Sequence, residues 1–110
     1  MPDLQPLGEF EQTVMLGVLQ CGPDAYGVPV WREIHARTAR EVSLAAVYKT
    51  LDRLESKGFV KSHLGEPTAE RGGRAKRVYK VTAAGLRVLR ASLGALARMT
   101  RGLGEVLDTP

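Results

Sequence analysis

Apolar residues recur along the chain with two different periods, and the change from one to the other outlines the fold. Residues 7–20 carry apolar side chains at helical spacing and end at a glycine-proline pair, which predicts a first helix. Pro29 fits the first turn of a second helix, which ends near Thr38. Ser43 is a good N-cap for a third helix, and Gly58 closes it.

The second half of the chain changes from helical to strand-like patterning and back. Residues 59–64 and 77–81 are predicted to form two strands joined by a polar, glycine-broken tip, and Thr82 opens a last helix. Three helices, a hairpin and a helix make a mostly α fold with a small β hairpin (α+β), in the order of a winged helix-turn-helix. We therefore expect a winged helix-turn-helix domain over 1–81 and a C-terminal dimerisation helix over 82–110, within one compact unit.

The predicted third helix, about residues 43–57, has two different faces. Its apolar residues fall at steps of three, four and three and make a core-facing stripe. On the other face, small residues permit close approach to a groove, and long cations reach phosphates or guanine edges. The alternative is a plain amphipathic helix with its charges in water, which the basic hairpin that follows disfavours. The predicted DNA contacts of this helix are Ser43, Ala45, Ala46, Tyr48, Lys49 and Arg53.

The hairpin tip, about residues 65–77, is too polar to pack and too rich in glycine to be regular. It crowds cations whose mutual repulsion an anion would relieve. In a wing they would lie along the minor groove of DNA, beside the site of the helix in the major groove. An RGG-type RNA segment is the alternative, weakly supported by one copy in a hairpin. The predicted contacts are Arg71, Arg74, Lys76 and Arg77.

Charge is distributed unevenly along the chain, whose net charge is +4. The first 24 residues hold four acidic and no basic side chains, whereas residues 71–101 hold nine basic and no acidic ones. This asymmetry predicts a polyanionic partner, with a merely solvated cationic surface as the alternative.

Length and composition exclude several classes of protein. A chain of 110 residues, 44% of them hydrophobic, fits one globular domain. No apolar run is long enough to cross a membrane and no secretory leader opens the chain. The lone Cys21 cannot form an internal disulfide, so we expect a cytoplasmic protein. His35 and His63 belong to no ligand-spaced cluster and Cys21 to no nucleophile motif, so no metal, cofactor or enzymatic activity is predicted.

Short motifs spread over nearly the whole chain resemble those of one known family. They lie at residues 25–29, 43–48, 51–54, 57–58, 72–74 and 79–82. The family is PadR, the phenolic-acid-type transcriptional repressors with a winged-helix domain, and the resemblance is to its small-chain class. It implies a homodimer that binds double-stranded operator DNA near promoters and, in some members, releases it on binding a small aromatic molecule. Ala75 departs from the family, which often has proline there.

The last predicted helix carries a leucine seam with heptad-like spacing, in which Thr100 fills one gap. We expect it to pack against a second copy, which would set two recognition helices about 34 Å apart, one turn of DNA. Packing on the first helix of the same chain is the alternative. Gly102 and Gly104 are expected to fray its end. The predicted dimerisation residues are Leu86, Leu89, Leu93, Leu96 and Leu103.

Trp31 has two readings. It falls beside apolar residues of the second predicted helix, which favours core packing; at a dimer interface it would instead stack on a flat ligand. Taken together, the sequence predicts a dimeric, sequence-specific DNA-binding regulator, with repression resting on the resemblance alone. A winged-helix protein–protein adaptor is the runner-up, and cations on both the helix and the hairpin argue against it.

Overall fold

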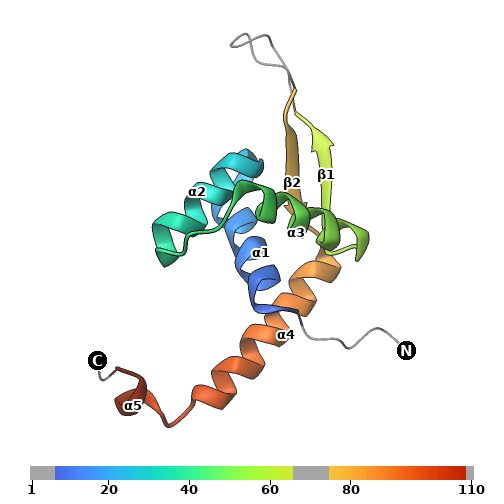
Figure 1. Cartoon of the computed structure of the whole chain (residues 1–110). Coiled ribbons are helices and arrows are strands. Elements are labelled where there is room, and N and C mark those ends of the chain that lie inside the picture. Colours follow the sequence, from blue (N-terminus) through green and yellow to red (C-terminus); the bar gives the residue numbers. More distant parts are fainter. Residues whose placement is uncertain (1–6, 66–74, 109–110) are drawn as a thin grey trace.

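The computed structural model describes residues 7–65 and 75–108 (Figure 1). Three helices precede a two-stranded antiparallel hairpin, and two helices follow it, which confirms the predicted mostly helical fold class. The elements are α1 (Glu9–Cys21), the short 3-10 turn η1 (Gly22–Asp24), α2 (Gly27–Thr38), α3 (Leu44–Ser56), β1 (Val60–Leu64), β2 (Arg77–Val81), α4 (Ala83–Thr100) and α5 (Gly104–Asp108).

The ends of α3 are set by its neighbours in the sequence, as predicted. The Ser43 hydroxyl accepts a hydrogen bond from the Ala46 amide at 3.0 Å, which satisfies one of the free N–H groups of the first turn. At the other end, Gly58 has φ +80°, a conformation that favours glycine. The Gly58 amide then bonds the Glu55 carbonyl, and the Phe59 amide bonds that of Leu54. This pair of bonds is a Schellman motif, which turns the chain from α3 directly into β1.

α1 occupies the centre of the domain and packs against α2, α3 and β2 (Figure 1). The apolar stripe of α3 faces it, as the sequence predicts. The largest fully buried side chains come from α1, α2, α3 and β1, so one core joins the three helices to the hairpin. They are Met15, Leu51, Leu54, Val14, Val30, Val47 and Val60.

An ion pair between the buried carboxylate of Glu11 and the exposed Lys57 joins the first turn of α1 to the end of α3. Glu11 is only 7% exposed, and its carboxylate accepts hydrogen bonds from Lys57 Nζ at 2.8 Å and from the Gly8 amide at 2.9 Å. Burial pushes the pKa of Glu11 upward, but these two bonds and the nearby charges of Lys57 and Arg53 outweigh it. The pKa of Glu11 therefore lies below its ordinary value.

This pair gives folding stability a defined pH dependence. Because the folded pKa of Glu11 is depressed, its stabilisation is present above the ordinary pKa of 4.5 and is lost as pH falls through the folded pKa. We expect Glu11→Gln to lower the free energy of unfolding by about 1–2 kcal/mol at neutral pH. Urea denaturation should show this difference shrinking as the pH falls from neutral through the folded pKa of Glu11.

The exposed Glu41 supplies the control for this experiment. Glu41→Gln makes the same chemical change on the loop before α3, and it should leave stability unaltered over the same pH range. A Glu11→Gln deficit that stayed constant between neutral and acid pH would contradict the assignment.

The start of α4 is locked onto the turn between α3 and β1. Thr82 caps α4 by accepting a hydrogen bond from the Gly85 amide at 3.0 Å, and its hydroxyl donates to the Gly58 carbonyl at 2.7 Å. Its own amide bonds the Phe59 carbonyl at 3.0 Å. Gly85 lies so close to this turn that an added Cβ would stand 2.1 Å from the Phe59 carbonyl oxygen. A glycine is therefore required there by space.

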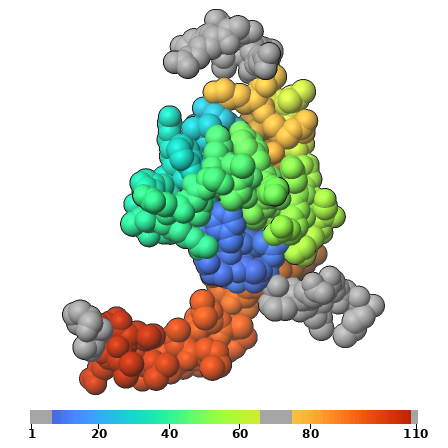
Figure 2. All heavy atoms as spheres, viewed as in Figure 1, coloured from blue at the N-terminus to red at the C-terminus, as the bar shows by residue number. Residues whose placement is uncertain are grey.

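Beyond its first turns, α4 leaves the domain as an arm (Figure 2). Leu89 is 3% exposed in the domain's own core, whereas Leu96 and Met99 farther along are 59% and 76% exposed. The radius of gyration is 15.9 Å, against about 13 Å for a compact chain of this size. Without a partner, the arm leaves much of its apolar surface in water.

The predicted single helix over 82–110 is instead two helices. α4 ends at Thr100, and Gly102 takes φ +85° before α5 begins at Gly104. Because Gly102 turns the backbone there, Leu103 and Leu107 do not continue the leucine seam of α4. Glycine thus ends this helix, where only fraying was expected.

Candidate nucleic-acid interface

α3 presents a polar face to solvent that carries Lys49 and Arg53 together with the acidic Asp52. Lys49 and Arg53 are exposed, and no ion pair joins either to an acidic side chain in the described part of the chain. Tyr48 is 40% exposed, while the Ser43 hydroxyl is already engaged as the helix cap. Ala45 is exposed and leaves the helix start unobstructed. Ala45, Lys49 and Arg53 are thus exposed together, whereas the predicted contact Ala46 is partly buried.

The hairpin projects beside α3 (Figure 1). Glu55 of α3 ties the two elements together. The Glu55 carboxylate of α3 accepts hydrogen bonds from the Ser62 hydroxyl at 2.7 Å and from the Ser62 amide at 3.1 Å. Arg77 in turn donates to the Ser62 hydroxyl at 3.0 Å. One predicted wing residue is therefore connected through β1 to α3. Arg71 and Arg74 lie outside the described residues.

Lys76, at the base of the wing, rests on an aromatic ring of the corner where α2 begins. Its ammonium lies 4.2 Å from the centre of the Tyr26 ring, within the range of a cation–π contact. Next to it, the Tyr79 amide of β2 donates to the Ala25 carbonyl at 2.8 Å. The hairpin is thus braced by two successive residues of one corner.

The same corner holds the start of α3. A Cβ built on Gly27 would stand 2.2 Å from Tyr48 Cζ, so the Tyr48 ring packs directly over the Gly27 backbone. Tyr26 and Gly27 therefore contact both elements, the wing base through Lys76 and the recognition helix through Tyr48. No individual role is predicted for Tyr26 from the sequence, where it is one residue of the motif at 25–29 and precedes a predicted helix.

Comparison with known proteins identifies the family of this chain. Residues 15–91 match the family described as transcriptional regulator PadR-like. The chain belongs to the PadR-like family of transcriptional regulators. No curated protein sequence matches the chain.

Solved structures share the fold of this PadR-like chain over most of its length. A PadR-like regulator from Bacillus cereus has 18% identity and a TM-score of 0.70, with 92% of this chain and 93% of that chain covered. A PadR family regulator from Eggerthella lenta has 28% identity and a TM-score of 0.65, with 93% and 88% covered. A transcriptional regulator from Thermoplasma acidophilum has 22% identity and a TM-score of 0.67, with 92% of this chain and 93% of that chain covered.

Family membership settles the class of activity. PadR-like proteins are transcriptional regulators that bind DNA, so this chain is a DNA-binding regulator and not an enzyme. Within residues 7–65 and 75–108, no three His, Cys, Asp or Glu side chains gather as metal ligands. Burial, and then the charges of Glu33 and Asp24, raise the pKa of the Cys21 thiol, which favours its unreactive protonated form. None of the described helices is long and apolar enough to cross a membrane.

Trp31 has a structural task in this PadR-like fold. Its indole N–H donates to the Val42 carbonyl at 2.7 Å, and its ring packs partly buried against the core. Val42 immediately precedes the cap of α3, so this bond fixes the loop that leads into the helix. These contacts support the prediction that Trp31 packs against the core.

The predicted dimerisation leucines fall into two groups, those that pack against the domain core and those that are exposed. Leu89 is buried in the domain core and Leu86 is partly buried against it. Leu93, Leu96 and Leu103 are exposed, and the last lies beyond the end of α4. The free apolar surface therefore begins one helical turn after Leu89.

Proposed function

We propose that the protein is a cytoplasmic, homodimeric repressor that binds a specific double-stranded operator. α3 would enter the major groove, and the wing over residues 65–77 would contact the adjacent minor groove. The observation that carries the proposal is the shared brace at Tyr26 and Gly27. It holds the polar face of α3 and the base of the wing in one fixed relation, as simultaneous contact with neighbouring grooves requires.

The homodimer is proposed from the α4 arm. The exposed apolar residues of the arm lie beyond the reach of the chain's own core, and a second copy would cover them. Two-fold symmetry would then present two α3 helices to half-sites about 34 Å apart. Repression itself is carried over from the family resemblance.

Release of DNA by a small aromatic effector is also carried over from that resemblance. Trp31 remains a predicted ligand contact only if a cavity between two copies reaches it. A screen of Trp31 fluorescence against aromatic compounds tests this directly, because Trp31 is the only tryptophan. No spectral change with any compound would leave Trp31 as a packing residue alone.

Fluorescence anisotropy with a labelled duplex from the promoter beside the protein's own gene tests the proposed function. A scrambled duplex and two salt concentrations serve as controls. We expect salt-dependent binding that prefers the promoter duplex by about a thousandfold or more. Equal weak binding to both duplexes would contradict a specific operator in that promoter, and no binding at low salt would contradict the proposed DNA-binding mode.

Substitutions in the two elements should have different signatures. Lys49→Ala, on α3, should alter preference among operator variants by about 1–3 kcal/mol, as a base contact does. Arg74→Ala, in the wing, should weaken binding to all sequences similarly and reduce the salt slope by about one. Anisotropy titrations over several duplexes and salt concentrations separate the two. Parent-like binding by both variants would show that the interface lies elsewhere.

The Gly27 corner gives a test of positioning. The added methyl of Gly27→Ala must displace the Tyr48 ring, which can swing outward without disturbing the core. We expect Gly27→Ala and Tyr48→Ala each to weaken operator binding about tenfold, or about 1.4 kcal/mol. The double variant should be no weaker than Tyr48→Ala, because both changes remove one contact. Additive losses would show that the contact does not position α3; thermal melts should confirm that all three variants fold.

A further inference from the structure

Four arginines along α4 have no part in the proposed contacts of α3 and the wing. They are the last four of the nine basic residues between 71 and 101. All four are exposed, and no ion pair joins any of them to a carboxylate within the described part of the chain. We call them the arginine stripe: Arg87, Arg90 and Arg98 of α4, and Arg101, which directly follows its last residue.

The arginine stripe follows one side of the helix. At about 100° per residue, the three arginines of α4 fall within an arc of about 80°, and Arg101 continues the same line. Between the first pair and the second, this side carries only Ala91 and Gly94. The Arg98 guanidinium lies back over Gly94, 3.4 Å from the place where a Cβ would stand. Nothing larger than a methyl group therefore separates the two pairs.

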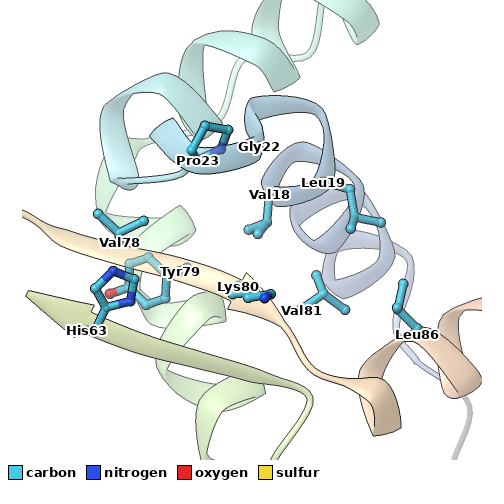
Figure 3. Close-up of a pocket in the computed structure, with 10 residues that line it drawn as sticks. All are labelled: Val18, Leu19, Gly22, Pro23, His63, Val78, Tyr79, Lys80, Val81 and Leu86. Atoms are coloured by element: carbon cyan, nitrogen blue, oxygen red, sulfur yellow. The ribbon is translucent and has the colours of Figure 1, made fainter. Parts of the chain in front are cut away.

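The stripe points away from the domain that carries α3. Leu89 and Gly85 mark the opposite, domain-facing side of α4, since Leu89 is buried in the core and Gly85 lies against the turn after α3. Leu86 on this side lines a hollow together with Leu19 and Val81 (Figure 3). The exposed leucines of α4 share that side, whose centre lies about 130° around the helix from the stripe. A second copy that covers the leucines therefore leaves the stripe accessible.

The stripe has an electrostatic cost that an anionic partner would remove. Side chains three residues apart are neighbours on a helix, so like charges at this spacing repel and destabilise it. The sequence holds no acidic residue from 71 to 101 that could compensate. Arg98 and Arg101 at least complement the helix dipole at its C-terminal end, whereas Arg87 and Arg90 gain nothing from it.

We infer that the arginine stripe binds the phosphate backbone of a second DNA segment, whatever its sequence. The rise of a helix places Arg98 about 16 Å beyond Arg87, and the major groove of DNA is about 12 Å wide. Because arginine side chains are long and flexible, each pair reaches the phosphates at one edge of the groove. The guanidinium group also suits this contact, since it forms paired hydrogen bonds with phosphate oxygens.

Two other polyanionic partners fit the stripe less well. A basic helix on a membrane surface buries its apolar side among the lipids, and the apolar side of α4 is the surface proposed to meet a second copy. A protein partner would need apolar anchors beside the charges, and the stripe offers only Ala91 and Gly94 there. A DNA backbone requires only the cations.

The inference has a consequence for regulation, which rests on the proposed function. A dimer that holds its operator with α3 and the wing would present two arginine stripes on its other side. It would therefore bridge the operator and a second stretch of DNA. The affinity of the stripe itself for DNA does not depend on an operator.

Binding by the stripe is measured on the full chain after three predicted operator contacts are removed by Lys49→Ala, Arg53→Ala and Arg74→Ala. The probe is a labelled random-sequence duplex, followed by fluorescence anisotropy at several salt concentrations. Backbone amide resonances locate the duplex on the protein. We expect salt-dependent binding, with shifts at residues 87–101 and none over 43–57.

Two double variants in this chain separate charge from structure. Arg87→Gln with Arg98→Gln should weaken the duplex about tenfold and reduce the salt slope by about two. Arg87→Lys with Arg98→Lys keeps both charges and should retain the parent slope. Sedimentation velocity should give the same mass for both double variants and the parent, because the stripe lies off the proposed dimer surface.

Three results would overturn the inference. Amide shifts confined to residues 43–57 and 75–81 would place the duplex on the α3 side alone and leave the proposed function intact. An unchanged affinity and salt slope in the glutamine variant would show that these arginines do not contact DNA. Phosphatidylserine vesicles or polyglutamate that shifted residues 87–101, when the random duplex did not, would assign the stripe to a membrane or an acidic protein.

Discussion

Gly85→Ala is expected to destabilise the domain by about 3 kcal/mol or more, because the new methyl has no room. It would stand 2.1 Å from the Phe59 carbonyl oxygen, a backbone atom that cannot rotate away. Relief requires α4 to move off the turn between α3 and β1. That movement would break the bonds from Thr82 to Gly58 and Phe59. Urea denaturation followed by circular dichroism measures the loss.

Gly94→Ala is the matched control, because it makes the same change in the same helix. A Cβ at Gly94 meets only the mobile Arg98 guanidinium at 3.4 Å. Alanine is favoured over glycine within a helix, so this variant should gain up to about 1 kcal/mol. If Gly85→Ala were as stable as Gly94→Ala, the close approach of α4 to Phe59 would not exist in solution.

Leu96→Asp is expected to turn a dimer into a monomer. Leu96 is 59% exposed on the arm, so an aspartate there costs the folded monomer little. In the proposed dimer the carboxylate would be buried without a partner, which costs about 3 kcal/mol and weakens association about a hundredfold or more. Sedimentation velocity measures the change of mass. Operator affinity should fall with it, because each monomer would bind one half-site alone.

Ala91→Asp controls for charge on the arm. Ala91 is exposed, and helical geometry places it on the side of α4 opposite Leu93. This variant should remain dimeric and keep the thermal stability of the parent. A parent chain that sediments as a monomer at tens of micromolar would refute the proposed dimer before any variant is made.

Local signals in the sequence located the elements correctly because each depends on near neighbours. Ser43 and Thr82 cap their helices as predicted, and Gly58 adopts the positive φ that ends α3. The apolar stripe of α3 faces the core because helical periodicity alone places those side chains on one side. The error at the C-terminus has the same origin. Gly102 and Gly104 are evident in the sequence as residues that destabilise a helix. That free-energy cost does not reveal whether the helix end frays or the backbone turns.

In the candidate site, too, local features could be predicted from the sequence and contacts between distant residues could not. Lys49 and Arg53 could be assigned to one face of α3 from spacing, and that face is exposed. The support beneath it could not be predicted. Tyr26 meets Lys76 and Gly27 meets Tyr48 because the path of the chain returns the hairpin and α3 to one corner. No periodicity connects residues so far apart in the sequence.

The order of helices and strands, the caps that bound them, and the cationic residues of α3 and the wing could all be predicted from the sequence. These features depend on side-chain chemistry and on spacing within a few residues. The packing of whole elements places Leu89 in the domain core and leaves Leu96 exposed. The same packing pairs Glu11 with Lys57. Burial and contact between distant residues depend on how whole elements pack. The same leucine pattern is compatible with side chains buried in the domain core and with side chains left exposed.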